Sequence, residues 1–179
     1  MMKKVCKLFM AWQFEEEEQW LNQMSRQGWQ LEKTNGLLYT FQQGGMDQYQ
    51  YRVQMVDSLS KAGDYLQFLS EAGIEHVGTC FNGLWIYLRK QNNGEPFELF
   101  SDTTSQLRHL QKIKKQLDIC KALFCVVYLL ECILSLLDPH RLNALCLLVF
   151  LPFLMAICHG LGTLSEKIKT LEKEQLIHD

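Results

Sequence analysis

The side chains that could do chemistry in this 179-residue chain fall into three sets. Four consecutive glutamates at residues 15–18 could bind a cation, or they could favour the N-terminus of a helix through its dipole. Five histidines and seven cysteines are scattered along the chain, without a C-x-x-C pair or another spacing typical of a metal site. We therefore predict no metal ion and no cofactor.

The third set consists of aromatic residues and two arginines in the N-terminal half. If they line an open groove, they could hold an apolar ligand that carries an anionic group. The members of this candidate ligand site are Trp29, Tyr39, Tyr49, Tyr51, Arg52, Trp85 and Arg89. The alternative is that most of the aromatic side chains form the core of the domain.

Sequence patterns typical of catalysis and of nucleic-acid binding do not occur. The chain contains no G-x-S-x-G, no P-loop and no Cys-His arrangement, so we predict no catalytic residues and no enzymatic activity. Residues 1–100 contain nine basic and twelve acidic side chains. This acidic balance does not match the basic face of a nucleic-acid-binding protein.

The elements that must position these residues form an internal duplication. The segment that starts at Trp20 reads as a helix, a glycine stop, a strand, a glycine turn and a strand, and the segment that starts at Tyr65 repeats this order. Gly28 aligns with Gly73 at the helix ends, and an Asn-Gly pair marks each hairpin turn. A further strand is predicted before each helix; the second, at residues 48–55, alternates between two faces.

These patterns predict an α+β fold in which a strand–helix–strand–strand unit occurs twice. We expect six mainly antiparallel strands in one layer with two helices on one face and the other face open. This duplicated domain is expected to be cytosolic and to span residues 1–90. Residues 91–116 are expected to form a linker and a basic helical stalk.

Two apolar stretches follow, at residues 117–137 and 142–162. Each has the length of about 20 residues that a helix needs to cross a bilayer, and residues 138–141 form a turn signal between them. The sequence therefore predicts a helical transmembrane hairpin, followed by a cytosolic helical tail at residues 163–179. A buried helical hairpin in a soluble core is the alternative, although such helices normally show a polar stripe.

The charges that flank the two stretches predict their orientation. Lysines and arginines gather before the first stretch and after the second, whereas the connecting loop contains only Arg141. Both termini are therefore expected in the cytoplasm, with the protein as a multi-pass protein of the cell membrane and the lipid bilayer as its partner.

Glu131 interrupts the first apolar stretch and needs a polar contact, because a carboxyl group near the middle of a bilayer is costly. Pro152 cannot donate a backbone hydrogen bond, so the carbonyl group of Leu148 is left free. We predict that protonated Glu131 donates to this carbonyl group, which lies at a similar depth. The alternatives are that Glu131 reaches toward the outer interface or pairs within an oligomer.

The runs EEEEQWLNQMSRQGWQL, YTFQQG and YQYRVQ, which lie between Glu15 and Gln54, resemble the DUF 2812 family, a bacterial domain of unknown function. The resemblance covers about the first 90 residues, and Ile74 stands where a tryptophan would be more typical. It implies the duplicated fold and, in many members, a C-terminal membrane hairpin. It also implies a setting in which such proteins accompany PadR-like transcription regulators.

Together these patterns predict a membrane-anchored binding or regulatory module. Its partner would be a small amphipathic ligand or a protein bound between the repeats. The alternative is a structural subunit whose hairpin packs against another membrane protein or a second copy of the chain.

Overall fold

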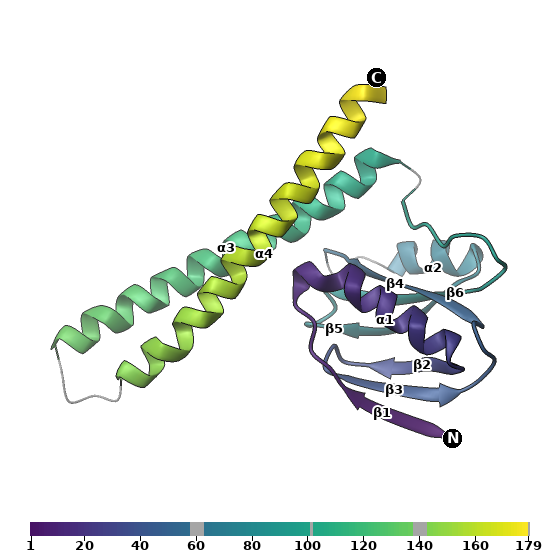
Figure 1. Cartoon of the computed structure of the whole chain (residues 1–179), viewed down its shortest axis with the longest axis horizontal. Helices are drawn as coiled ribbons and strands as arrows, with labels where there is room; N and C mark the ends of the chain where they lie inside the picture. The colour runs from purple at the N-terminus through teal and green to yellow at the C-terminus, as the bar shows by residue number, and fades with distance from the viewer. Residues whose placement is uncertain (58–62, 101, 138–142, 179) are drawn as a thin grey trace. The chain divides into compact units, whose positions relative to one another are not determined.

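The computed structural model describes the backbone of residues 1–57, 63–100, 102–137 and 143–178; of these, the side chains of 135–137, 143–149 and 176–178 are not described. The chain divides into two compact units, Met1–Ser101 and Asp102–Asp179. The first unit contains the duplication and the second contains a pair of long helices (Figure 1).

The first unit confirms the predicted duplication. The first repeat contains β1 (Met2–Cys6), a short 3-10 helix η1 (Ala11–Gln13), α1 (Phe14–Arg26), β2 (Trp29–Thr34) and β3 (Leu38–Gln43). The second contains β4 (Tyr49–Met55), α2 (Gly63–Glu71), β5 (Ile74–Cys80) and β6 (Trp85–Gln91). Gly28 and Gly73 follow α1 and α2 with φ angles of +81° and +74°. The predicted glycine helix ends are therefore present in both repeats.

The strands form two antiparallel three-stranded sheets, not the single layer that the sequence predicted. The first sheet has the order β1-β3-β2 and the second the order β4-β6-β5, so the two repeats have the same topology. The free edge of β2 explains the break between the sheets. There the N–H of Leu31 donates to the hydroxyl of Tyr51 (2.9 Å), and its carbonyl accepts from Arg89 (3.2 Å). These backbone groups are thus satisfied by side chains of the second sheet, where a strand would otherwise pair.

The prediction that both helices lie on one face is also wrong. Ile86 and Leu88 of β6 pack in a cluster with Leu69 of α2. Tyr87, between them in the sequence, instead donates a hydrogen bond to Glu17 of α1. Because successive residues of a strand point to opposite faces, α1 and α2 lie on opposite faces of the second sheet. Helix α1 therefore lies between the two sheets, whereas α2 covers the far side of the second sheet.

Side chains of α1 also cover the free edge of β4. Asn22 accepts from the N–H of Tyr51 (2.8 Å) and donates to its carbonyl (3.2 Å). The Ser25 hydroxyl donates to the carbonyl of Tyr49 (2.7 Å), and Glu18 accepts from the N–H of Val53 (2.8 Å). The spacing of four and three residues along the helix places these three side chains on one stripe. This stripe satisfies backbone groups that an edge strand otherwise leaves open.

The core of the first unit fills the spaces on either side of the second sheet. The largest side chains that are completely or almost completely buried there belong to Leu21, Leu31, Tyr39, Phe41, Tyr51, Ile86, Tyr87 and Leu88. Trp20 of α1 packs edge-on against Tyr39 and Phe41, with ring centres 4.9 and 5.6 Å apart. Most of the predicted aromatic set is therefore used for packing.

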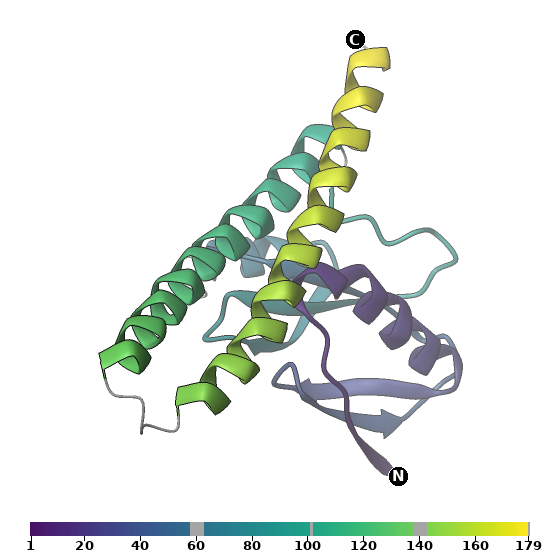
Figure 2. The same cartoon turned by 60° about the vertical axis from the view of Figure 1, so that its left-hand side comes forward.

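The second unit consists of α3 (Thr103–Leu137) and α4 (Asn143–His178), which lie side by side in Figures 1 and 2. Leu110, Ile113 and Leu117 are buried on α3, and buried residues also recur along α4 at Ile157, Leu161, Leu164 and Ile168. The predicted stalk and first apolar stretch thus form one continuous helix. The predicted second stretch continues into the tail in the same way.

Over the part of the chain that the structure describes, a search for a helical segment with the length and hydropathy of a membrane span finds none. The predicted turn at residues 138–141 lies outside the described residues. So do part of the stretch at 142–162 and the last side chains of the stretch at 117–137.

Candidate functional site

The seven residues predicted to bind a ligand do not line one groove. Tyr39 and Tyr51 are completely buried, and Trp85 is 7 % exposed. Trp29 lies beneath the ammonium group of Lys3, which is 5.3 Å from the ring centre. A role of these seven residues in ligand binding remains a prediction.

Three of the seven come together where the second sheet meets β2. The guanidinium group of Arg89 lies 4.4 Å from the ring centre of Tyr49. It also pairs with Glu75 at 2.7 Å, so its charge is already balanced. Tyr51 and Arg89 hold the backbone of Leu31, as described above. This cluster therefore joins the two repeats and offers little unpaired charge to an anionic ligand.

Arg52 lines a separate polar cleft of about 640 Å³, which is open to solvent. One wall consists of the exposed side of α1 and the other of β4 and the loop that follows β6. The lining residues are Gln19, Asn22, Gln23, Arg26, Asp47, Gln50, Arg52, Asn92 and Gly94. Of the predicted ligand site, only Arg52 is among them. The amides of Asn22 and Gln50 already donate within the protein, whereas the amides of Gln19 and Gln23 and the guanidinium group of Arg26 can donate to a polar ligand.

The charge in this cleft depends on Glu18. Its carboxylate lies 3.4 Å from the guanidinium group of Arg52. Burial raises the pKa of Glu18 to about 7, although the N–H of Val53 and the charge of Arg52 oppose this shift. Arg26 is exposed at the end of α1. An anion in the cleft would therefore meet one unshielded arginine, one arginine shared with Glu18, and the acidic side chain of Asp47, which also lines the cleft.

A buried carboxyl group forms a second unusual site. Glu17 is only 6 % exposed, and its Oε1 atom accepts from the hydroxyls of Tyr39 (2.6 Å) and Tyr87 (2.7 Å). The Sγ atom of Cys80 lies 3.6 Å from the Tyr87 hydroxyl. Burial raises the pKa of Glu17, and the two tyrosine hydroxyls oppose this shift. Burial also raises the pKa of Cys80 to about 11, so this thiol is not activated as a nucleophile.

Sequence reasoning grouped Glu17 with its three acidic neighbours at the start of the helix. A sharper signal was present, because Glu17 shares its helical stripe with Leu21 and Met24 at spacings of four and three residues. A carboxyl group on the apolar stripe of an amphipathic helix is expected to be buried and hydrogen-bonded. The same spacing from Glu18 to Asn22 and Ser25 marks the stripe that covers β4.

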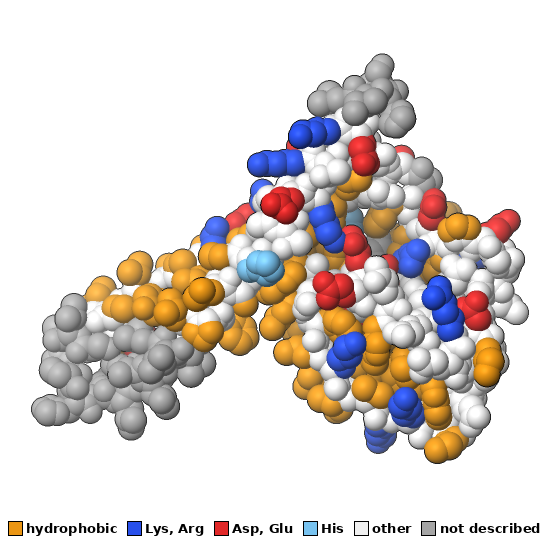
Figure 3. Space-filling model, in the orientation of Figure 1, with side chains coloured by type: hydrophobic (Ala, Val, Ile, Leu, Met, Phe, Trp, Pro, Cys, Tyr) orange, Lys and Arg blue, Asp and Glu red, His pale blue; other side chains and the backbone are white. Residues whose placement is uncertain are grey.

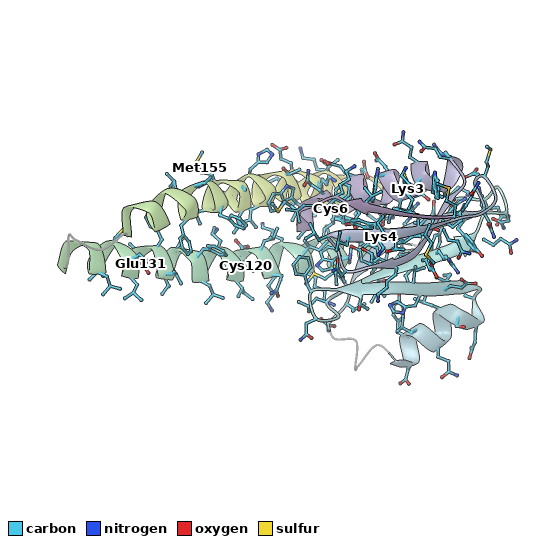
Figure 4. All side chains as sticks on the ribbon, turned by 90° about the horizontal axis from the view of Figure 1, so that it is seen from below. Lys3, Lys4, Cys6, Cys120, Glu131 and Met155 are labelled. Atoms are coloured by element: carbon cyan, nitrogen blue, oxygen red, sulfur yellow. The ribbon has the colours of Figure 1, made fainter. Side chains whose placement is uncertain are left out.

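Within the described ranges no cluster of histidine, cysteine and carboxyl side chains could hold a metal ion. Glu131 is half-buried on α3, and Pro152 lies exposed within α4. Figure 4 labels Glu131 and shows Met155 of α4 pointing away from the helical pair. The side chain of Leu148 is outside the described residues, so the contact between Glu131 and Leu148 remains a prediction.

The family model described as "Protein of unknown function (DUF2812)" matches residues 13–124, which is more than half of the chain. The chain belongs to the DUF2812 family. The match extends beyond the predicted 90 residues into α3, and it leaves β1 outside. Comparison with curated proteins and with solved structures finds no match. The DUF2812 assignment agrees with the predicted resemblance and names no activity.

Proposed function

We propose that this DUF2812 protein is a non-enzymatic binding module that α3 and α4 hold at a membrane. The observation that carries the proposal is a set of large apolar side chains exposed on these helices. Its members are Ile119, Leu123, Val126, Val127, Leu129, Leu130, Ile133, Leu151, Phe153 and Met155, each at least 41 % exposed. Figure 3 shows hydrophobic side chains gathered on the helical pair. An apolar surface of this extent marks contact with a membrane or a partner.

The charges around the exposed apolar face favour lipid as its covering. On α3 the exposed residues recur at spacings of three and four, as in Val126, Leu129, Leu130 and Ile133, so they form one broad face of the helix. Lysines return on both helices at the ends that lie away from residues 138–142. This arrangement supports the proposal of a hairpin in the cell membrane with both termini in the cytoplasm.

Flotation of the full-length chain with liposomes tests the anchor. We expect the protein to float with the lipid and to stay there in high salt, because apolar contacts hold it. The double change Leu123→Lys and Val126→Lys should return most of it to the aqueous fraction. Gln111→Lys with Gln116→Lys, both exposed and outside the apolar set, is the matched control. A wild-type chain that remains a folded monomer in the supernatant without detergent would refute the anchor.

The cleft beside α1 is the proposed binding site of the module. Its two arginines suit the anionic group of a small amphipathic ligand, and such a ligand could link the protein to PadR-associated regulation. Hexanoate is a simple probe of this chemistry. It should raise the melting temperature of the full-length chain, since binding to the native state stabilises it. The change Arg26→Gln should abolish most of this rise, whereas Lys33→Gln, which alters an exposed residue of β2, should not. An equal rise in both variants would remove the cleft from the proposal.

A structural interaction subunit is the second candidate function. Half-buried Glu131, within an otherwise apolar part of α3, favours it because a carboxyl group there could bond a partner helix or a second copy. Crosslinking in membranes followed by purification separates the two proposals. A stable membrane partner that is lost in Glu131→Leu would favour the interaction subunit. Flotation without such a partner would favour the binding module.

A further inference from the structure

Glu17 is a buried carboxyl group without a basic partner among the described residues. Its Oε1 atom accepts both tyrosine hydroxyls, whereas no donor to its Oε2 atom is found in that part of the chain. Its pKa is shifted by burial and by the hydroxyls of Tyr39 and Tyr87, and neither tyrosine is a base. A buried carboxyl group without a basic partner favours its neutral form, and a cation that joins it favours the ionised form.

A small cavity of about 20 Å³, measured for the centre of a water-sized sphere, adjoins this carboxyl group. That volume holds roughly one group of the size of a water molecule. The walls are mostly apolar and come from η1, α1, the second sheet and the turns. They include the aromatic residues Phe9, Phe14, Phe81, Trp85 and Tyr87. The sulfur-containing residues Met10 and Cys80 also line the cavity.

The rim of the cavity is aromatic as well. Phe81 is 66 % exposed and lies in the turn between β5 and β6, where its φ angle is +49°. This backbone conformation is uncommon for a bulky residue. The turn thus holds a large apolar ring in solvent beside the cavity, although burying that ring would be favourable.

We propose that this cavity binds the ammonium head of a small alkylammonium ion. The head forms an ion pair with Glu17 and lies against the faces of the surrounding aromatic rings, which attract cations. Its alkyl chain extends past Phe81 and covers part of that ring. An anion would be repelled by the ionised carboxylate, and a neutral alcohol could not form the ion pair with Glu17. This site is separate from the cleft that contains Arg52, and it does not depend on membrane attachment.

Butylammonium chloride is the probe, with n-butanol as its neutral counterpart of similar size. Isothermal titration calorimetry and thermal melting of the full-length chain measure binding. We expect butylammonium to bind and to raise the melting temperature, and butanol at the same concentration to have little effect. Equal responses to the two compounds would overturn the proposal, because the ionic contact would then contribute nothing.

The variant Glu17→Gln keeps an acceptor for the two tyrosine hydroxyls and removes the charge. It should weaken butylammonium binding by roughly tenfold or more, as expected when a charge-assisted contact is lost. The matched control is Glu32→Gln, which removes an exposed carboxylate from β2. Retained affinity in Glu17→Gln, or an equal loss in Glu32→Gln, would overturn the site.

If Glu17→Gln fails to fold, Phe81→Ala provides an independent test, because this side chain is exposed and adds little to the core. It should weaken butylammonium binding several-fold and leave the melting temperature of the free protein nearly unchanged. Unaltered affinity in Phe81→Ala would exclude the rim from the site and contradict the proposed position of the alkyl chain.

Discussion

Helices α1 and α2 occupy the same position in their repeats, and their residues correspond at a constant offset. Leu21 matches Leu66, Ser25 matches Ser70, and a glycine follows each helix two residues after its last residue. In α2 only the stripe that faces its own sheet is buried, so Ser70 is exposed. In α1 a second stripe is covered by the second sheet, and Ser25 is completely buried. One helical pattern therefore serves as a surface helix in one repeat and as an interior helix in the other.

The two sheets differ in the same sense, because a face that is buried in the second sheet is not buried in the first. The face of the second sheet that meets α1 contains Val53, Trp85 and Tyr87, all buried. The equivalent face of the first sheet contains Lys4, Leu38 and Thr40, none of them buried. Hence the helix of the first repeat packs against the sheet of the second repeat, whereas among the described residues no helix of the second repeat packs against the sheet of the first. The outer face of the first sheet is accordingly more polar. The difference between the repeats reflects their order in the stack and not a different fold.

The largest expected effect compares Leu21 with Leu66. Replacing completely buried Leu21 by Ala should lower the free energy of unfolding by about 3 kcal/mol, because a cavity forms in the core that α1 covers. Leu66 is only partly buried, so Leu66→Ala should cost about 1 kcal/mol. Urea denaturation of the full-length chain, followed by tryptophan fluorescence, measures both. Equal losses would contradict the distinction between interior and surface helix.

Ser25 and Ser70 provide a sharper comparison, because the residue type is identical. Ser25→Ala leaves the backbone groups of Tyr49 on the β4 edge without their partner and should cost about 2 kcal/mol. Ser70→Ala should change the free energy of unfolding by less than about 0.5 kcal/mol, as expected for an exposed site. The same denaturation assay applies. If Ser25→Ala were neutral, the α1 side chains would not be what protects β4.

The pH dependence of stability should be specific to α1, since Gly63 stands at the position in α2 that corresponds to Glu18. The pKa of Glu18 is raised to about 7 in the folded chain from 4.5. The folded state thus binds the proton of Glu18 more tightly than the unfolded state does. The contribution of this proton to the free energy of unfolding is fully present below about pH 4.5 and is lost as the pH rises through about 7. We expect a loss on the order of 1 to 2 kcal/mol between pH 5 and pH 8.

Glu18→Gln should reduce that loss, whereas Glu32→Gln should leave it unchanged. Part of the dependence should remain in Glu18→Gln, because the pKa of Glu17 is raised as well. Urea titrations at several pH values provide the comparison. A stability that increases between pH 5 and pH 8 in the wild type would reverse the sign of this prediction.

The smallest effect concerns the two glycines that end the helices. Gly73→Ala should cost about 1 kcal/mol because of its positive φ angle, since its surroundings leave open space for a methyl group. At Gly28 the added Cβ would also lie 3.3 Å from the carbonyl oxygen of Gly44. Gly28→Ala should therefore cost a few tenths of a kcal/mol more. Thermal melting of the two variants side by side can resolve the difference, and the reverse order would contradict the tighter packing of the first repeat.

Much of the fold could be predicted because it depends on local patterns. The matching glycines, the alternation in β4 and the helical stripes identified both repeats and almost all of their elements. The candidate ligand site was less predictable. Tyr39, Tyr51 and Trp85 look alike in the sequence whether they line a groove or fill a core, and that choice depends on which sheet packs against them.

The sequence by itself determined the duplicated unit and the long helical pair, because backbone periodicity and glycine positions act over a few residues. It also determined the membership in DUF2812. Only the tertiary structure decided that the strands form two sheets, that α1 lies between them, and that Glu17 is buried against two tyrosines. These features depend on how one repeat stacks on the other. Stacking is set by contacts between residues far apart in the chain, such as the hydrogen bond from Tyr87 to Glu17, which no local pattern encodes.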